Sequence, residues 1–140
     1  MAVTSSIYPT AIGRLFTAEI DLDTDDLKVA LVDNSAAYSS ADSIFDDVSS
    51  TEITGTGYSA GGVTLTGVSV DSNDDIITLN ADDATWPTST LSAYGAVVYA
   101  DLATPYLICF IDFNDEAATT AEDFVIDFSA GVLTATAGAA

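Results

Sequence analysis

The stretch Ser92–Phe113, SAYGAVVYADLATPYLICFIDF, contains two apolar runs, Ala96–Tyr99 and Tyr106–Phe113, on either side of the segment Asp101–Pro105. Each run is too short for a typical helix and is rich in β-branched and aromatic residues, which favour buried strands. The segment between them contains aspartate and proline, both common in turns. The stretch therefore predicts a buried hairpin around which the rest of the chain is arranged.

Patterns elsewhere in the chain predict further strands. Apolar residues alternate with polar ones, or form short apolar runs, in segments separated by turn signals every 8–12 residues or so, which is typical of a β-sandwich or barrel. The segments are Leu27–Val32, Val63–Val70, Ile76–Leu79, Phe124–Phe128 and Val132–Ala135. We therefore expect an all-β fold, an antiparallel β-sandwich of about eight strands, jelly-roll-like or Ig-like.

The segments outside these strands predict short helices, turns and an N-terminal arm. Apolar residues spaced by three and four predict a short N-terminal helix within Thr10–Ile20, continuing as a strand over Ala18–Leu22. Residues 1–9 are expected to be an extended N-terminal arm or a frayed tail. A one-turn helix is expected at Asp42–Phe45, turns at Asp71–Asp75 and at Asn80–Pro87, where Trp86 would cap the core, and an acidic loop at Asn114–Glu122.

Composition limits the class of protein. The 140 residues fit one domain, 1–140, long enough to bury about 70 % of its unfolded surface. Two cations, Arg14 and Lys28, stand against 22 acidic residues, which gives a net charge of −20. Nucleic acid and anionic membranes need basic contacts that this chain lacks, so neither is an expected partner. A basic protein surface, divalent cations or high salt are compatible with this charge.

Catalytic and metal sites have little support. The chain has no histidine and one cysteine, Cys109, so a serine triad or a zinc site has too few ligands or bases, and Cys109 is expected to be a buried apolar residue. Asp21, Asp23 and Asp25 resemble the start of an EF-hand, but Asp26 and Val32 occupy positions that need glycine and glutamate. A weaker calcium site there, at Asp74 and Asp75, or at Asp82 and Asp83, is the alternative to solvated turn carboxylates, which we favour. We expect no enzyme, no cofactor and no metal.

A glycine-rich segment and four aromatic residues are the remaining candidates for a binding site. Gly55–Gly62, GTGYSAGG, contains four glycines and predicts an irregular loop with positive φ angles. Tyr58, Trp86, Tyr94 and Tyr99 could form a sugar-binding platform, although packing in a core or interface is favoured. The first ten residues lack the charged and apolar regions of a secretory signal, and no apolar run is long enough to span a membrane, so folding in a cytoplasm is expected.

Several short segments follow one another along the chain: Glu19–Leu31 (EIDLDTDDLKVAL), Asp46–Ser49 (DDVS), Gly55–Gly62 (GTGYSAGG), Asp82–Trp86 (DDATW), Ala96–Tyr99 (AVVY) and Ile111–Phe113 (IDF). In this order they resemble a family of small virion structural proteins of tailed bacteriophages. The resemblance covers nearly the whole chain, although the chain has fewer cations than many members.

The resemblance implies a capsid decoration (cement) protein, made in the host cytoplasm and located in the virion. Its partner would be the major capsid protein or another virion protein, and it would act as a homo-oligomer. The expected partner interface is formed by Ile7, Tyr8, Pro9 and Tyr58. The alternatives are a tail, neck or fibre-base component, and a carbohydrate-binding module for receptor attachment.

Overall fold

The structure, a computed structural model, describes residues 4–136 of the chain. In that part the chain forms ten strands, the helix α1 (Pro9–Phe16) and two 3-10 turns, η1 (Phe45–Asp47) and η2 (Ser49–Thr51). The strands are β1 (Thr4–Ile7), β2 (Leu27–Val32), β3 (Val63–Thr64), β4 (Ser69–Asn73), β5 (Ile76–Asn80), β6 (Ala84–Ser89), β7 (Ser92–Ala100), β8 (Leu107–Ala118), β9 (Glu122–Ile126) and β10 (Leu133–Thr136).

The predicted central hairpin is confirmed as β7 and β8. These strands lie in the middle of a five-stranded sheet with the order β1-β8-β7-β2-β3, and each neighbouring pair is antiparallel. Val98 pairs with Cys109 of β8 on one side and with Val29 of β2 on the other, and all three side chains are buried. The two apolar runs are therefore continuous because both faces of these strands are covered.

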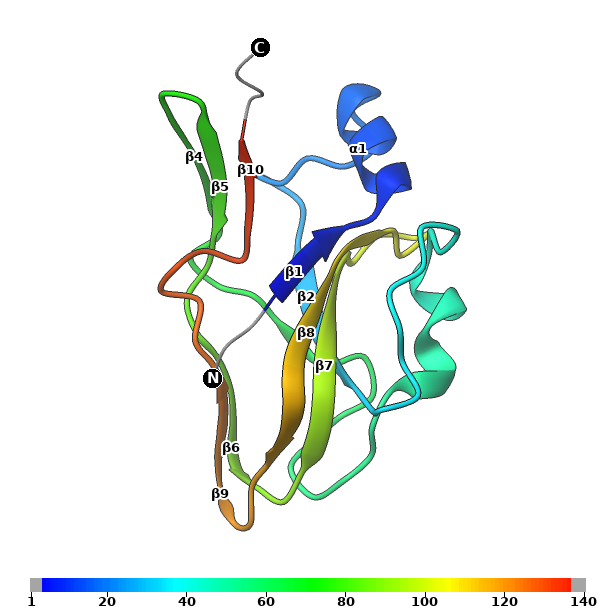
Figure 1. Cartoon of the computed structure of the whole chain (residues 1–140), viewed down its shortest axis with the longest axis vertical. Coiled ribbons are helices and arrows are strands. Elements are labelled where there is room, and N and C mark those ends of the chain that lie inside the picture. Colours follow the sequence, from blue (N-terminus) through cyan, green and yellow to red (C-terminus); the bar gives the residue numbers. More distant parts are fainter. Residues whose placement is uncertain (1–3, 137–140) are drawn as a thin grey trace.

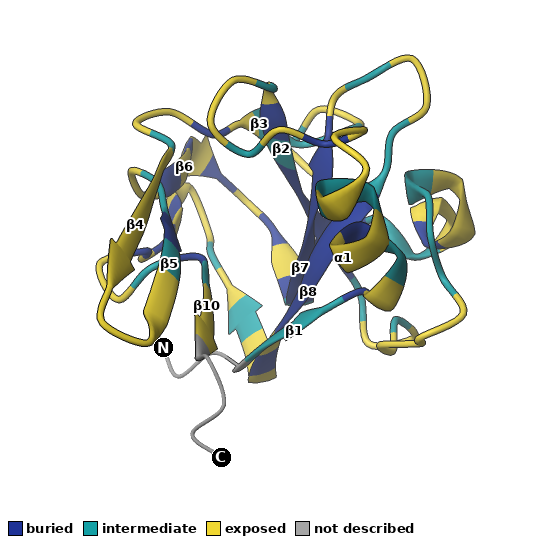
Figure 2. Cartoon of the chain, turned by 90° about the horizontal axis from the view of Figure 1, so that it is seen from above, coloured by how far each residue is buried: buried dark blue, intermediate teal, exposed yellow. Residues whose placement is uncertain are grey.

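A second layer covers one face of the main sheet. It consists of a three-stranded sheet, β10-β5-β4, and a two-stranded ribbon, β6-β9, which lie on the same side of the main sheet (Figures 1 and 2). Aromatic rings join the layers: Phe124 of β9 lies 6.2 Å from Phe113 of β8 and meets Trp86 of β6 edge to face at 5.8 Å. The expected antiparallel β-sandwich is thereby confirmed, with ten strands instead of about eight.

The opposite face of the main sheet is covered by α1 and by the long connection from β2 to β3, which contains η1 and η2 (Figure 1). Phe45 of η1 stacks on Tyr99 of β7 with a centroid distance of 4.4 Å. The Arg14 guanidinium of α1 lies 3.9 Å from the centre of the Tyr106 ring. The predicted one-turn helix therefore exists, at Phe45–Asp47 instead of Asp42–Phe45.

From Thr4 to Ile7 the expected extended segment is a strand of the main sheet and not a free arm. Residues Thr4–Ile7 form β1, an edge strand that pairs with β8, and the Ser5 hydroxyl donates a hydrogen bond of 2.9 Å to the Val132 carbonyl. Residues 1–3 of that arm lie outside the described residues. The helix ends at Phe16, and no strand follows over Ala18–Leu22.

The single strand expected over Val63–Val70 is also wrong. Gly67 has a φ of +62°, and the chain on either side of it belongs to different sheets, β3 in the main sheet and β4 in the three-stranded sheet. The Asp82 backbone N–H donates to the Thr66 carbonyl at 2.8 Å, which fixes this break.

Two expected turns are strands. Trp86 lies in β6, where a register irregularity between Trp86 and Ser89 accommodates Pro87, a residue that cannot donate to a regular ladder. The first half of the expected acidic loop is also strand, because β8 continues to Ala118. Asn114, with a φ of +64°, lies in a bulge opposite Ala93–Gly95, and pairing with β7 resumes after this bulge. The turn near Asp74 is confirmed, although the strands extend further towards it than predicted.

Candidate functional site

The residues of the expected partner interface lie in different environments. Tyr8 is fully buried, stacks on Tyr38 at 5.2 Å, and its backbone N–H donates to the Ile108 carbonyl at 3.0 Å. Burial, and then the nearby Asp42 carboxylate, raise the pKa of the Tyr8 hydroxyl. A buried side chain has no surface to offer a partner, so the structure does not support Tyr8 in this role. Ile7 is half-buried and Pro9 is exposed, and their role stays a prediction.

Tyr58 holds the glycine loop onto the main sheet. Its hydroxyl accepts a hydrogen bond from the Leu31 N–H at 3.0 Å and donates one to the Glu52 carboxylate at 2.7 Å. The same carboxylate accepts the Gly61 N–H at 2.7 Å. The Tyr58 ring stacks on Trp86 at 6.1 Å. These contacts make Tyr58 a structural residue of the loop.

The expected alternative of a sugar platform from Tyr58, Trp86, Tyr94 and Tyr99 is wrong for three of the four. Trp86 and Tyr99 are buried, and Tyr58 is engaged in the loop. The Tyr99 hydroxyl donates to the Gly61 carbonyl at 2.6 Å, and burial raises the pKa of Tyr99 to about 12. Packing, the interpretation favoured from the sequence, is confirmed for these three, whereas Tyr94 borders a cleft.

The Asp21–Asp25 segment caps its own turn. The Asp25 carboxylate accepts the Asp21 N–H at 2.8 Å, and the Asp21 carboxylate accepts the Asp23 N–H at 3.0 Å, as in the turns that aspartate favours. Within residues 4–136, no group of three His, Cys, Asp or Glu side chains could hold a metal ion. Cys109 is fully buried, as predicted, and burial raises the pKa of its thiol to about 12.

A partly exposed apolar surface, which we call the apolar end face, lies where α1 and the β4–β5 hairpin reach the same end of the molecule (Figure 1). A groove of about 470 Å³ runs between them. Phe16, which follows groove-lining Leu15 in sequence, is 85 % exposed. The apolar end face consists of the exposed residues Phe16, Val70 and Ile77, the half-buried residues Leu15 and Leu22, and the buried residue Ile20, which forms its floor. All but Phe16 line the groove.

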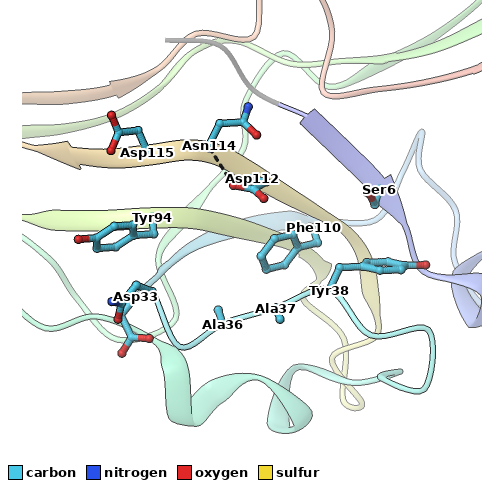
Figure 3. Close-up of a pocket in the computed structure, with 11 residues that line it drawn as sticks. Ser6, Asp33, Ala36, Ala37, Tyr38, Tyr94, Phe110, Asp112, Asn114 and Asp115 are labelled. Carbon is cyan, nitrogen blue, oxygen red and sulfur yellow. Dashed lines mark hydrogen bonds between the residues drawn. The ribbon is translucent and has the colours of Figure 1, made fainter.

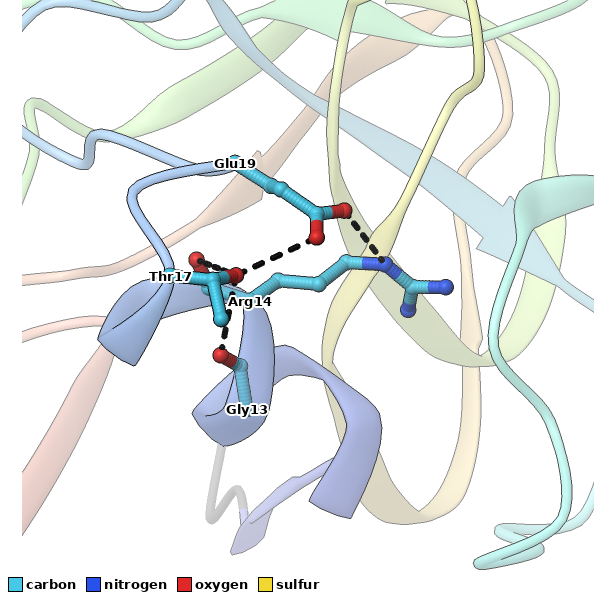
Figure 4. A network of polar contacts seen from close by, with 4 residues as sticks. All are labelled: Gly13, Arg14, Thr17 and Glu19. Atoms are coloured by element: carbon cyan, nitrogen blue, oxygen red, sulfur yellow. Dashed lines mark hydrogen bonds and ion pairs between the residues drawn. The ribbon is translucent and has the colours of Figure 1, made fainter.

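The end of α1 shapes one wall of this groove. Ala18 adopts a φ of +61°, its N–H donates to the Leu15 carbonyl at 3.3 Å, and the Glu19 N–H donates to the Arg14 carbonyl at 2.9 Å. This is a Schellman motif, which reverses the chain at a helix C-terminus. The Thr17 hydroxyl, 3.2 Å from the Gly13 carbonyl and from the Glu19 carboxylate, reinforces it (Figure 4). The reversal brings the following residues, Ile20 and Leu22, back to the groove.

The charges around the apolar end face are negative. Asp21 and Asp23 line the groove, and Asp71, Asp74 and Asp75 are exposed on the β4–β5 hairpin. Neither of the two cations of the chain lines the groove, and each lies beside a carboxylate outside its lining. The Arg14 Nε lies 3.8 Å from the Glu19 carboxylate (Figure 4), and the Lys28 Nζ lies 4.0 Å from the Asp101 carboxylate. The apolar end face is therefore bordered by carboxylates without compensating cations on the hairpin or in the groove.

A second concave site, which we call the aromatic cleft, lies between the segment 33–38 and strands β1, β7 and β8 (Figure 3). It has a volume of about 610 Å³. Three rings and three carboxylates line it, from Tyr38, Tyr94, Phe110, Asp33, Asp112 and Asp115. The Asp112 carboxylate accepts the Asn114 N–H at 2.8 Å, and Asp33 accepts the Ser35 N–H at 2.8 Å, so both acids are held in place.

Sequence reasoning missed both concave sites. Each one combines side chains from segments far apart in the chain, such as Leu15 with Ile77, or Asp33 with Asp112. The patterns of Thr10–Ile20 and Ile76–Leu79 predict a helix and a strand, but they do not show which of the apolar side chains remain exposed. The one available signal was the abundance of apolar residues in and just after the expected helix, at Leu15, Phe16, Ile20 and Leu22, of which the structure fully buries only Ile20.

Comparison of the chain with protein-family models, with curated proteins and with solved structures found no match in any of the three. Among the helices in residues 4–136, none has the length and apolar character needed to cross a membrane.

Proposed function

We propose that this chain is a bacteriophage virion structural protein that acts as a capsid decoration protein, binding and stabilising the assembled head. The observation that carries the proposal is the apolar end face on an otherwise strongly acidic molecule. Isolated surface apolar residues are ordinary, but a grooved apolar surface with a nearly fully exposed phenylalanine is typical of an interaction site. The sequence resemblance supplies the head of a tailed phage as the place of action.

A decoration protein needs a stable fold and a docking surface, and no reaction. The antiparallel sandwich supplies the first and the apolar end face the second. By binding only the assembled lattice, the protein would stabilise that state by mass action. Its partner is the major capsid protein or another virion protein, and neighbouring copies on the lattice form the homo-oligomer.

The test is to add the purified protein to phage heads that lack it and to measure binding and the temperature at which the heads release DNA. We expect saturable binding and a higher release temperature. No binding, or binding without any gain in heat resistance, would contradict the proposal. Electron microscopy of intact particles distinguishes decoration from the alternative, a tail or neck component. Copies spread over the head support decoration, whereas a single ring of copies supports a tail or neck component.

The aromatic cleft favours a second candidate, a carbohydrate-binding module for receptor attachment. Aromatic rings stack on the apolar faces of sugars, and carboxylates accept hydrogen bonds from hydroxyls, a combination that suits a neutral polyhydroxylated ligand. Tyr94, Asp33 and Asp112 would supply these contacts.

A glycan array probed with the wild-type protein and with Tyr94→Ala, with and without calcium, tests this candidate. Binding that Tyr94→Ala abolishes would support it. The absence of any glycan binding, or binding that Tyr94→Ala leaves unchanged, would contradict it.

A further inference from the structure

We infer that the apolar end face is the surface through which this protein docks, and that its occupant is a partner segment whose apolar side chains are flanked by lysine or arginine. This inference rests on the proposed function and specifies the docking surface and the chemistry of the partner. It also moves the docking surface away from Tyr8 and Tyr58, which the fold uses internally.

The apolar end face exposes side chains that the core does not need. The sandwich core is complete without Phe16, which is the last residue of α1 and is 85 % exposed. Val70 and Ile77 occupy opposite strands of the hairpin, and both remain more than a third exposed while lining the same groove as Leu15. An apolar side chain entering this groove would remove Val70 and Ile77 from water, and a neighbouring apolar group of the same partner could cover Phe16. Burial of apolar surface is the main favourable term in association.

The border of the groove is acidic. Asp21 and Asp23 line it, and Asp71, Asp74 and Asp75 lie exposed on the hairpin that forms one wall. An incoming lysine or arginine beside the apolar contact would meet these carboxylates at short range, which increases the association rate and the specificity.

The same carboxylates disfavour a second copy of this chain as the occupant. In a symmetric pair the end face of one copy would meet that of the other, and the acidic borders would be brought together. Each copy carries a net charge of −20, so the pair would add this repulsion to the local one. Charge complementarity therefore selects a basic partner.

The first experiment uses a synthetic helical peptide of leucine and lysine as the probe, titrated into the 15N-labelled protein and followed by NMR. Two matched peptides serve as controls, one of leucine and glutamate and one of serine and lysine. We expect only the leucine–lysine peptide to produce saturable shifts confined to α1, residues 18–23 and the β4–β5 hairpin. Shifts spread over the whole acidic surface, or equal binding of either control peptide, would overturn the inference.

Substitutions test whether the peptide binds at the apolar end face. Phe16→Ser and Ile77→Thr change exposed side chains, so both proteins should fold normally, and each should weaken peptide binding about tenfold or more. Val125→Thr is the matched control, since Val125 is similarly exposed to Ile77 but lies on β9 at the other end of the molecule (Figure 1). Unchanged affinity in both Phe16→Ser and Ile77→Thr, or equal loss in Val125→Thr, would overturn the inference.

Two further measurements test a second copy as the occupant and distinguish this docking surface from the proposed function. Sedimentation of the wild-type protein should show a monomer at moderate salt, and a dimer that Phe16→Ser abolishes would assign the face to a second copy. Phage heads lacking the protein should bind the wild type and not Phe16→Ser. Heads that bind neither protein would contradict the proposed function, whereas heads that bind both equally would contradict only this docking surface.

Discussion

Gly62 shows how closely the glycine loop approaches the main sheet. Its φ is +79°, a region that side chains rarely adopt, and a Cβ atom at this position would overlap the Val29 carbonyl oxygen of β2. Gly61 beside it also has a positive φ, and its carbonyl and N–H bind Tyr99 and Glu52. The glycine loop therefore lies flat on β2 only because Gly62 has no side chain.

Gly62→Ala should destabilise the protein strongly, by about 3 kcal/mol or more, because backbone strain and a clash with backbone are added together. Urea unfolding followed by far-ultraviolet circular dichroism measures the change. Gly13→Ala is the matched control: Gly13 lies in α1 with no atom within 4 Å of the added Cβ, so we expect a gain of about 0.5–1 kcal/mol. Similar effects of the two substitutions would show that the close approach to β2 is absent.

Strand β9 joins the two layers through one face only. Phe124 and Ile126 are buried, and Phe124 contacts both Trp86 and Phe113, whereas Val125 between them is 39 % exposed. The two-residue period of a strand explains this alternation, which is also why the sequence predicted a half-buried strand here.

Phe124→Ala should lower the free energy of unfolding by about 3–5 kcal/mol, because it removes a ring that both layers pack against. Val125→Thr should change it by less than about 0.5 kcal/mol. Urea unfolding of both variants measures the difference. Equal effects would mean that β9 does not have the orientation described.

The whole molecule carries 22 acidic residues and two cations, and both cations are already paired. The folded state concentrates this charge, so self-repulsion opposes folding and apolar burial must overcome it. One apolar core overcomes this repulsion. It contains residues of both layers, such as Leu31 of the main sheet and Trp86 of the second layer, together with Phe128 just after β9.

Added NaCl should therefore raise the melting temperature. The screening length falls from about 30 Å at 0.01 M salt to about 10 Å at 0.1 M. A gain of about 1 kcal/mol would appear as a rise of about 3–5 °C for a domain of this size, mostly below about 0.3 M. Differential scanning calorimetry over a salt series checks this. A rise that is linear up to molar salt would indicate a general salt effect instead of screening.

Alkaline pH should destabilise the fold. Burial raises the pKa of the Tyr8 and Tyr58 hydroxyls, and it raises the pKa of Tyr99 and of Cys109 to about 12 each, from ordinary values of 10.0 and 9.0. Above these ordinary values the unfolded chain loses protons that the folded chain keeps, so the free energy of unfolding falls as pH rises. For Tyr99 and Cys109 the stabilisation is fully present below about pH 9 and is lost by about pH 12, whereas the contribution of Tyr8 and Tyr58 continues to fall above that pH.

Urea midpoints measured from pH 8 to pH 12 test this dependence. Cys109→Ala removes one titrating group, so its free energy of unfolding should fall less steeply above pH 9, by about 1.4 kcal/mol per pH unit for one proton. The same slope in both proteins would mean that the Cys109 thiol titrates alike in the folded and unfolded states.

The local sequence was sufficient for the central hairpin and for strands β2, β5 and β9. Their signals are run length and a period of two, which come from the strand itself and need no knowledge of its partners. The composition likewise excluded nucleic acid as an expected partner, because the number of cations is a property of the chain and not of its fold.

Other features came from contacts between distant segments. Thr4–Ile7 is a strand because β8 has a free edge beside it, and Trp86–Pro87 is tolerated in β6 because a bulge opposite β9 relieves the missing N–H. The apolar end face arises where α1 meets a hairpin more than 50 residues away. A periodic pattern specifies which side chains share a face, but only the packing of the layers specifies which of those faces remains in contact with water.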